Sequence, residues 1–302
     1  GGNEEWAIDN FRVAEVVACS NPVINTQPSN ASVCVGGNTN FSIASTGATS
    51  WQWQVNMGAG FVNVVNGGVY SGATTQTLTI TGATAVMSGY LYRCIATILT
   101  CNTTSNQATL TVSNPSLVVN SQLNVSCFGG SNGSATVSPA SGGIAPYSYN
   151  WTPGNPTGDG TISVTGLTAG TWTCTVTDNI GCATTATFNI TQPTALVLNA
   201  NSQTNISCFG GSNGAASCNA ATGGAGGYTY NWTPGNPTGD GTVSVTGLTA
   251  GTWTCTVTDA NACVATRTFN ITQPTAIVVT PASQTNVSCF GGSNGAASIN
   301  TP

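Results

Sequence analysis

The sequence predicts an all-β protein of tandem β-sandwich domains, arranged as beads on a string. Aromatic residues alternate with small polar ones, for example at Tyr147, Tyr149 and Trp151, which is the two-residue period of strands with one buried face. Clusters of Gly and Pro, such as residues 152–160, separate the strands and predict turns. No segment shows a convincing helical period, and short strands punctuated by frequent turns are typical of sandwiches.

The N-terminal segment, residues 1–19, fits none of the units described below. Its residues 4–13 alternate like a strand, so we expect the last strand of a preceding domain. The terminus lacks the basic and apolar regions of a signal peptide. We therefore expect a mature product or an internal piece of an exported protein.

Residues 20–113 are expected to form an immunoglobulin-like sandwich. Cys34 is followed by Trp51 and Trp53, and Tyr92 stands two places before Cys94. In immunoglobulin sandwiches a tryptophan packs on the disulfide between the sheets, and a tyrosine two places before the second cysteine fixes a corner of the chain.

The second half of the chain is repetitive. The motif Cys-Phe-Gly-Gly-Ser-Asn-Gly begins at Cys127, Cys208 and Cys289, and the differences 208 − 127 and 289 − 208 both equal 81. Longer motifs that begin at Asn150 and Gly170 recur at the same interval. This predicts one repeat over 114–193, a second over 194–274, and the start of a truncated third over 275–302.

Composition restricts the compartment and the partners. Twelve cysteines at fixed spacings in so polar a chain predict disulfides and an oxidising compartment, such as the periplasm or the cell exterior. A zinc site is the competing interpretation of the cysteines, but the sequence contains no Cys-x-x-Cys pair and no histidine. A net charge of −5 without a basic cluster argues against nucleic acid, and no apolar run is long enough for a membrane span.

The sequence offers little for catalysis, so we expect no enzyme. Histidine and lysine are absent, and the three glutamates lie within the first fifteen positions. Asp159, Asp178, Asp240 and Asp259 stand where turns are expected, and we interpret them as turn formers because calcium needs several converging oxygen ligands. No cofactor or metal is expected.

The segments from Cys127 to Pro193 and from Cys208 to Pro274 resemble the SprB repeat of Bacteroidetes surface proteins. The shared features are the opening Cys-x-Gly-x-x-x-Gly, a Tyr-x-Tyr-x-Trp strand, a Leu-Thr-Ala-Gly-Thr turn, and a Val-Thr-Asp-x-x-x-Cys hairpin closed by Ile-Thr-Gln-Pro. The strand at residues 6–10 is similar to the closing strand of the jelly-roll domains in such proteins. The resemblance implies type IX secretion, exposure on the cell surface and a link to gliding adhesins.

Two disulfides are expected in the sandwich of residues 20–113. Cys34 and Cys94 would bridge the two sheets, which leaves Cys19 and Cys101 to join the entry of the domain to its exit.

In the repeats, Cys182 follows the turn after Asp178 and is poorly placed to reach Cys174. We therefore expect three bridges and two thiols without a partner among these residues. The expected bridges are Cys127–Cys182, Cys208–Cys263 and Cys218–Cys255, and the expected thiols are Cys174, buried, and Cys289.

The leading hypothesis is a non-catalytic structural or adhesive protein that forms a disulfide-stapled stalk or fibre on a bacterial surface. A gliding or attachment adhesin is one protein of this kind. A second hypothesis is a subunit that assembles with copies of itself into an extracellular filament by strand sharing. A third is a carbohydrate-binding module, which requires exposed tryptophans and is contradicted if Trp151 and Trp232 are fully buried. The surface or glycan ligand stays unknown.

Overall fold

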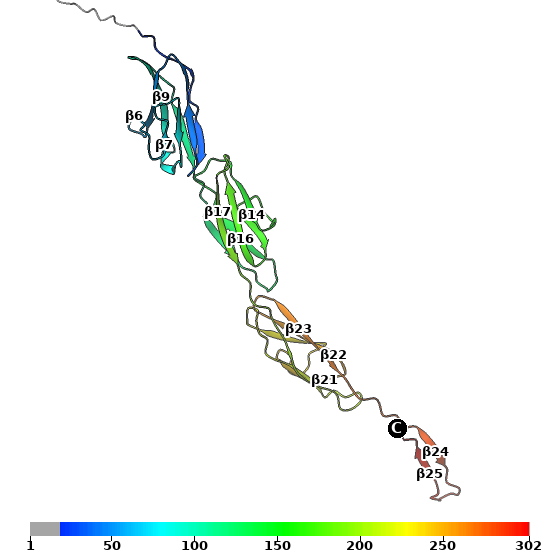
Figure 1. Cartoon of the computed structure of the whole chain (residues 1–302). Helices are drawn as coiled ribbons and strands as arrows, with labels where there is room; N and C mark the ends of the chain where they lie inside the picture. Colours follow the sequence, from blue (N-terminus) through cyan, green and yellow to red (C-terminus); the bar gives the residue numbers. More distant parts are fainter. Residues whose placement is uncertain (1–18, 302) are drawn as a thin grey trace, which may run out of the picture. The chain divides into compact units, whose positions relative to one another are not determined.

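The computed structural model describes residues 19–301, so the strand expected at residues 1–19 lies outside the described residues apart from Cys19. The described chain consists of strands, turns and one short 3₁₀ helix, Ala85–Met87 (Figure 1). It divides into two compact units that interleave within the first repeat. One comprises the residues up to 120 with 136–162 and 173–187, and the other comprises 121–135, 163–172 and the residues from 188 onward.

The first unit begins with a sandwich of two main sheets. The larger has the order β2-β11-β9-β5-β6, with β10 also paired to β9, and the smaller has the order β3-β8-β7, while β1 pairs with β4. The strands are β1 Val23–Thr26, β2 Ala31–Cys34, β3 Thr39–Ser42, β4 Ala44–Thr46, β5 Ser50–Asn56, β6 Phe61–Asn63, β7 Tyr70–Ser71, β8 Thr77–Ile80, β9 Leu91–Ile98, β10 Cys101–Thr104 and β11 Ala108–Ser113.

Aromatic side chains from both sheets fill the core of this sandwich. Trp53 and Tyr92 of the larger sheet are fully buried, and the ring of Phe41 on β3 stacks on Tyr92 with 4.8 Å between centroids. The Trp53 indole N–H donates to the carbonyl of Thr75 at 3.0 Å. The hydroxyls of Tyr92 and Tyr70 hydrogen bond at 3.0 Å. The tryptophan and the tyrosine of the expected pattern are therefore core residues.

The expected bridge between Cys34 and Cys94 is wrong, because the two cysteines do not lie on facing sheets. β2 pairs in parallel with β11, with Cys34 opposite Ser113, and β11 pairs with β9, which carries Cys94. Both cysteines thus belong to one sheet with a strand between them. Phe41, on the smaller sheet, contributes the aromatic ring that packs near Trp53, at 6.4 Å between centroids.

The first repeat contributes one three-stranded sheet to each unit. The sheet β14-β16-β17 lies mainly in the first unit, and there Trp151 is paired with Cys174. The sheet β12-β13-β15 lies mainly in the second unit. The strands are β12 Val119–Leu123, β13 Gly133–Val137, β14 Ser148–Thr152, β15 Ser163–Leu167, β16 Gly170–Thr177 and β17 Ala183–Ile190.

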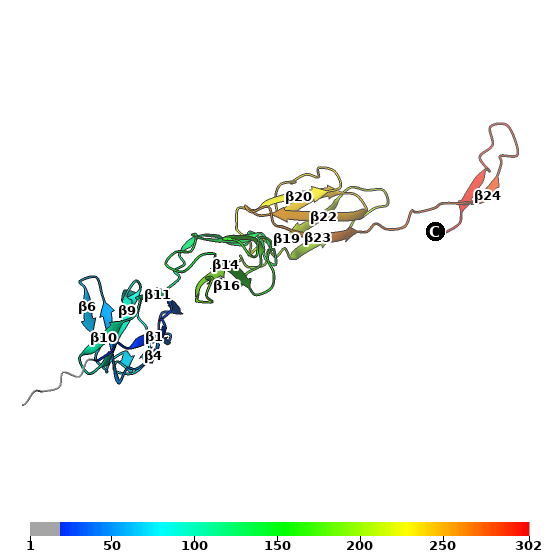
Figure 2. The ribbon, with the colours of Figure 1, turned by 90° about the horizontal axis from the view of Figure 1, so that it is seen from above.

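The second repeat lies wholly in the second unit and is a sandwich of the sheets β18-β19-β21 and β20-β22-β23 (Figures 1 and 2). Its core draws on both sheets and centres on the fully buried Trp232, 5.4 Å from the ring of Phe269. The strands are β18 Ala200–Thr204, β19 Gly214–Cys218, β20 Thr229–Thr233, β21 Ser244–Leu248, β22 Gly251–Thr258 and β23 Val264–Ile271.

After the second repeat, β24 Pro281–Thr285 and β25 Ala296–Ile299 form a two-stranded sheet. Every residue from 275 to 301 is exposed. The described structure confirms the fold class predicted from the sequence, an all-β chain of tandem sandwiches. The domain boundaries remain a prediction.

Candidate functional site

Three disulfides connect the described residues. Cys19–Cys101 lies within the first sandwich and is the same pair that the sequence analysis expects. Cys34–Cys182 joins the first sandwich to the first repeat, with 5.4 Å between Cα atoms, and Cys127–Cys263 joins the first repeat to the second, with 5.7 Å. Each of the latter two therefore connects consecutive modules of the chain. We call these two connections the disulfide joints.

The bridges expected within each repeat are wrong. In the second repeat the loop of Cys208 lies beside the end of β23, because Gly210 N donates to the side chain of Gln273 at 2.8 Å. Cys263 stands directly before the start of β23, a strand of 8 residues. At about 3.3 Å per residue the strand separates the two cysteines by about 25 Å, far beyond the Cα separation of a disulfide.

The first repeat has the same arrangement, which excludes the expected bridge between Cys127 and Cys182. Cys182 directly precedes β17, also of 8 residues, whereas the loop of Cys127 is bonded to Gln192 beyond the end of that strand, through Gly129 N at 2.7 Å. Each cysteine finds its partner in a neighbouring module instead.

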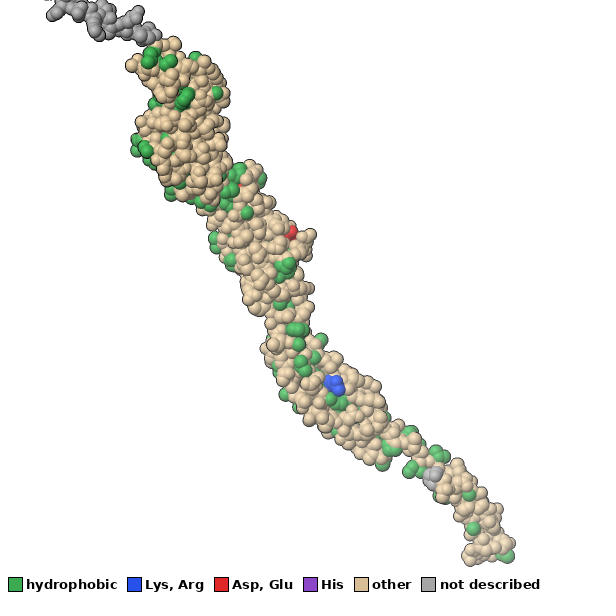
Figure 3. Space-filling model, in the orientation of Figure 1, with side chains coloured by type: hydrophobic (Ala, Val, Ile, Leu, Met, Phe, Trp, Pro, Cys, Tyr) green, Lys and Arg blue, Asp and Glu red, His purple; other side chains and the backbone are tan. Residues whose placement is uncertain are grey.

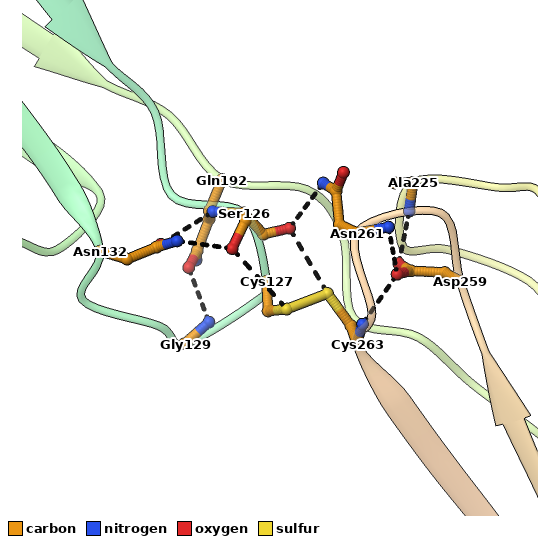
Figure 4. The surroundings of a disulfide bond; sticks show 9 residues. All are labelled: Ser126, Cys127, Gly129, Asn132, Gln192, Ala225, Asp259, Asn261 and Cys263. Carbon is orange, nitrogen blue, oxygen red and sulfur yellow. Dashed lines mark hydrogen bonds between the residues drawn. A yellow bond between two sulfur atoms is a disulfide. The ribbon is translucent and has the colours of Figure 1, made fainter.

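The opening loop of the repeat presents one cysteine of the joint between the repeats. Asn132 fastens this loop, because its amide donates to the Ser126 hydroxyl at 2.7 Å and its carbonyl accepts from Ser126 N at 3.0 Å (Figure 4). Gln192 accepts from Gly129 N. Side-chain amides thus hold the loop on both sides of Cys127.

An aspartate orients the hairpin that presents the other cysteine. One carboxylate oxygen of Asp259 accepts from Asn261 N and Cys263 N, both at 2.9 Å, and the other accepts from Ala225 N at 2.8 Å. Asn261 then donates its side-chain amide to the Ser126 carbonyl at 2.9 Å, beside the disulfide (Figure 4). The joint therefore combines the disulfide with a hydrogen bond between the two repeats.

The joint between the first sandwich and the first repeat uses the equivalent aspartate. Asp178 accepts from Cys182 N at 2.8 Å, Ile180 N at 3.1 Å and Ile144 N at 3.1 Å. The hydroxyl of Ser113, at the end of β11, donates to the same carboxylate. A side chain of the first sandwich thus reaches the group that positions Cys182.

Both aspartates are buried and ionised in this setting. The bond from Ala225 N to Asp259, assisted by those from Cys263 N and Asn261 N, lowers the pKa of Asp259. Burial alone would raise the pKa of Asp178, but the hydrogen bonds from Ser113 and three backbone N–H groups outweigh it and lower the pKa. Both aspartates are turn formers, as their sequence positions predict, because each accepts hydrogen bonds from the backbone two and four residues later.

The expected bridge between Cys218 and Cys255 is also absent, and both are buried thiols. Both belong to the core of the second repeat. Burial raises the pKa of Cys255 to about 12, so this thiol is not ionised at neutral pH.

The remaining cysteines are thiols in two different environments. Cys94 and Cys174 are buried, and burial raises their pKa to about 12 and about 11. Cys208 and Cys289 are exposed. Cys174 and Cys289 are thus thiols in the structure, as the sequence analysis expects.

The tryptophans proposed as a sugar platform are not available for stacking. Trp151 and Trp232 are both 0% exposed. Their indole N–H groups donate to the carbonyls of Thr161 and Thr242, each at 2.9 Å. This burial contradicts the carbohydrate-binding hypothesis that rests on these two residues.

Residues 19–301 offer no candidate for a metal-binding group or for a membrane-spanning helix. No group of three or more His, Cys, Asp or Glu side chains in that range could hold a metal ion. The same part of the chain contains no helix that is long and apolar enough to cross a membrane. The disulfide joints are therefore the most specific chemical feature in the described structure.

Comparison with known families identifies the repeated units. Residues 119–156 and 200–237 match the model of the SprB repeat. The chain carries two SprB repeats. The two matched segments begin at the first strand of each SprB repeat and include Cys127 and Cys208. The resemblance to the SprB repeat, predicted from the sequence motifs, is therefore confirmed.

Other comparisons add less. No curated protein matches the sequence. Among solved structures, the chain is similar to the titin domains I67–I69, with 14% identity over 85% of this chain and 100% of that one and a TM-score of 0.47. It is also similar to Sidekick-1 immunoglobulin domains 1–5, with 16% identity over 83% of this chain and 58% of that one and a TM-score of 0.34.

Sequence reasoning missed that the cysteines pair between modules. The hairpin cysteine and the opening cysteine each recur at the repeat period, so pairing within a repeat and pairing between neighbours produce the same spacing pattern. The signal that separates them is the 8-residue strand that follows each hairpin cysteine, because it carries the chain to the opposite end of the sandwich.

Proposed function

We propose that this chain is part of a non-catalytic, extracellular structural or adhesive protein, a disulfide-stapled stalk or fibre on a bacterial surface. The observation that carries the proposal is the pair of disulfide joints, which connect each module to the next. A disulfide between neighbours limits how far the chain can extend when either module unfolds under load. The two joints enclose 148 and 136 residues, and on the chain-entropy model each stabilises the folded chain by about 5 kcal/mol.

The surface composition supports an extracellular role. The chain has no lysine, three arginines and 4% charged residues, so it offers few sites to proteases that cleave after basic side chains. Figure 3 shows a visible face that consists mostly of uncharged polar and backbone atoms. Structural disulfides form and persist in oxidising compartments and are rare in the cytosol.

The finer assignments follow from the resemblance to SprB-repeat surface proteins. We infer export by type IX secretion and a role in attachment or gliding, with a surface or glycan ligand held by parts of the protein outside residues 19–301. The test is antibody labelling of intact, unpermeabilised cells together with alkylation of thiols before and after reduction. Surface labelling with Cys34, Cys127, Cys182 and Cys263 protected until reduction supports the proposal, whereas an internal protein with reduced joints refutes it.

A second candidate is a self-assembling filament. The described chain consists of several separate sheets, and each open sheet has edge strands to which a strand from another copy can add. Electron microscopy of the native material separates the candidates, because an ordered lattice supports the filament and isolated strings support the stalk.

A further inference from the structure

The joint between the two SprB repeats lines a cavity at the end of the first repeat. It has a volume of about 420 Å³, and its walls come from the opening loop (Cys127, Phe128), the linker (Ala195, Leu196) and the hairpin of the second repeat (Ala262, Cys263, Val264). The hairpin thus supplies one wall of the cavity and the second sulfur of the disulfide.

An equivalent cavity lies at the end of the second repeat. It measures about 400 Å³ and is lined by the next opening loop (Ser207, Cys208, Phe209) and the next linker (Pro274, Thr275, Ala276, Ile277). Cys208, Phe209, Ala276 and Ile277 each stand one repeat period after Cys127, Phe128, Ala195 and Leu196. No described residue of the chain lines this cavity in the place of Ala262, Cys263 and Val264.

The second opening loop is held in the same conformation as the first. Asn213 donates to the Ser207 hydroxyl at 2.8 Å and accepts from Ser207 N at 3.2 Å, as Asn132 does with Ser126. Gln273 accepts from Gly210 N at 2.8 Å, as Gln192 does from Gly129 N. The loop therefore has the conformation in which the first opening loop presents its cysteine to a partner. Cys208 itself is an exposed thiol.

We propose that the loop of Cys208 is the docking site for the Val-Thr-Asp-x-x-x-Cys hairpin of a following SprB repeat. Cys208 forms a disulfide with the cysteine of that hairpin, which falls one repeat period after Cys263. The chain already contains the start of such a repeat, because β24, the Cys289 motif and β25 follow the second repeat. The same rule assigns Cys289 to the repeat after that one.

The rule is that the opening cysteine of one module pairs with the hairpin cysteine of the next. The joint between the repeats follows this rule, since Cys127 of the opening loop pairs with Cys263. At the other joint the hairpin cysteine Cys182 also pairs with a cysteine of the preceding module, Cys34 at the end of β2. Bond formation removes two electrons and two protons from the two thiols, and a disulfide oxidant such as oxidised glutathione accepts them. The Cys208 thiolate attacks the oxidant and releases one glutathione, and the hairpin thiolate then displaces the second.

The test extends the whole chain after Pro302 with a copy of residues 222–274, which completes the third repeat in register (303 − 81 = 222). The appended copy carries Arg267→Lys, so its peptides differ in mass from those of the second repeat. The protein is folded in a glutathione redox buffer, the remaining thiols are alkylated, and disulfide-linked peptides are identified by mass spectrometry without reduction. The expected result is a linked pair of the Cys208 peptide and the appended hairpin, together with the Cys127–Cys263 pair.

Two matched variants make the test decisive. In Cys208→Ser the appended hairpin cysteine is expected to become alkylated, whereas in Cys289→Ser its link to Cys208 is expected to persist. Circular dichroism and tryptophan fluorescence establish that both variants fold. The proposal is overturned if Cys208 is alkylated in the folded extended chain while Cys127–Cys263 is intact, or if Cys208 pairs with Cys289 or with Cys208 of a second copy.

Discussion

The overlapping disulfides predict an unusually short maximum extension under force. In the oxidised chain the shortest covalent path from Cys19 to Cys263 crosses from Cys19 to Cys101, follows the backbone to Cys127 and crosses to Cys263. The backbone part of this path comprises 26 steps (127 − 101), which span about 9 nm at about 3.4 Å per residue. The reduced chain has 244 steps between the same cysteines (263 − 19), which span about 83 nm.

The assay is single-molecule force spectroscopy of the chain held by terminal peptide tags that contain no cysteine. Reduction is expected to lengthen the fully stretched chain by 218 steps (244 − 26), about 74 nm. The double variant Cys127→Ser with Cys263→Ser forces the path through Cys34–Cys182, which leaves 96 steps, or about 33 nm.

A matched control distinguishes these effects from general loosening of the fold. The double variant Cys34→Ser with Cys182→Ser removes one joint but leaves the shortest path unchanged, so its oxidised extension should equal that of the parent chain. Pairing within each repeat would instead give 52 steps between Cys19 and Cys263, or about 18 nm. An oxidised extension of that size would refute the joints.

Three further predictions concern stability and reactivity. The pKa of Asp259 in the folded chain lies below its unfolded value of 3.8, so this carboxylate stabilises the fold above pH 3.8, and the stabilisation is lost as the pH falls through the folded pKa. The melting temperature should therefore drop in acid less steeply in Asp259→Asn than in the parent chain. Parallel curves of melting temperature against pH would contradict this. Trp232→Ala removes a fully buried ring and should destabilise the second repeat by about 3–5 kcal/mol in urea unfolding, whereas Phe290→Ala, on an exposed ring, should change little. Iodoacetamide should modify Cys208 in the native chain but Cys94 only after unfolding, and equal rates by peptide mapping would show that Cys94 is not buried.

Local patterns in the sequence predicted the local structure well. The alternation around Trp151 gave a strand with the indole buried, and the repeat period placed the same strand around Trp232. The tyrosine and tryptophan near Cys94 were correctly assigned to a core. These features depend on contacts between neighbouring residues and on one buried face, which a single sequence records.

Pairings between distant segments could not be predicted in the same way. Cys34 was assigned to the sheet that faces Cys94, but its strand joins the same sheet through parallel pairing with β11, about 80 residues later in the chain. Alternation along a strand specifies which side chains are buried, but not which sheet the strand joins. The hairpin cysteines show the same limit, because their position relative to the opening loop depends on the direction of a whole strand.

The spans closed by the three disulfides overlap, since they run from residue 19 to 101, from 34 to 182 and from 127 to 263. Every peptide bond between Cys19 and Cys263 therefore lies inside at least one closed loop. A single cut by a protease anywhere in this stretch leaves both products covalently attached, and only reduction or a second cut releases them. A protein built on these overlapping loops would tolerate isolated damage to its backbone without losing whatever its far end holds.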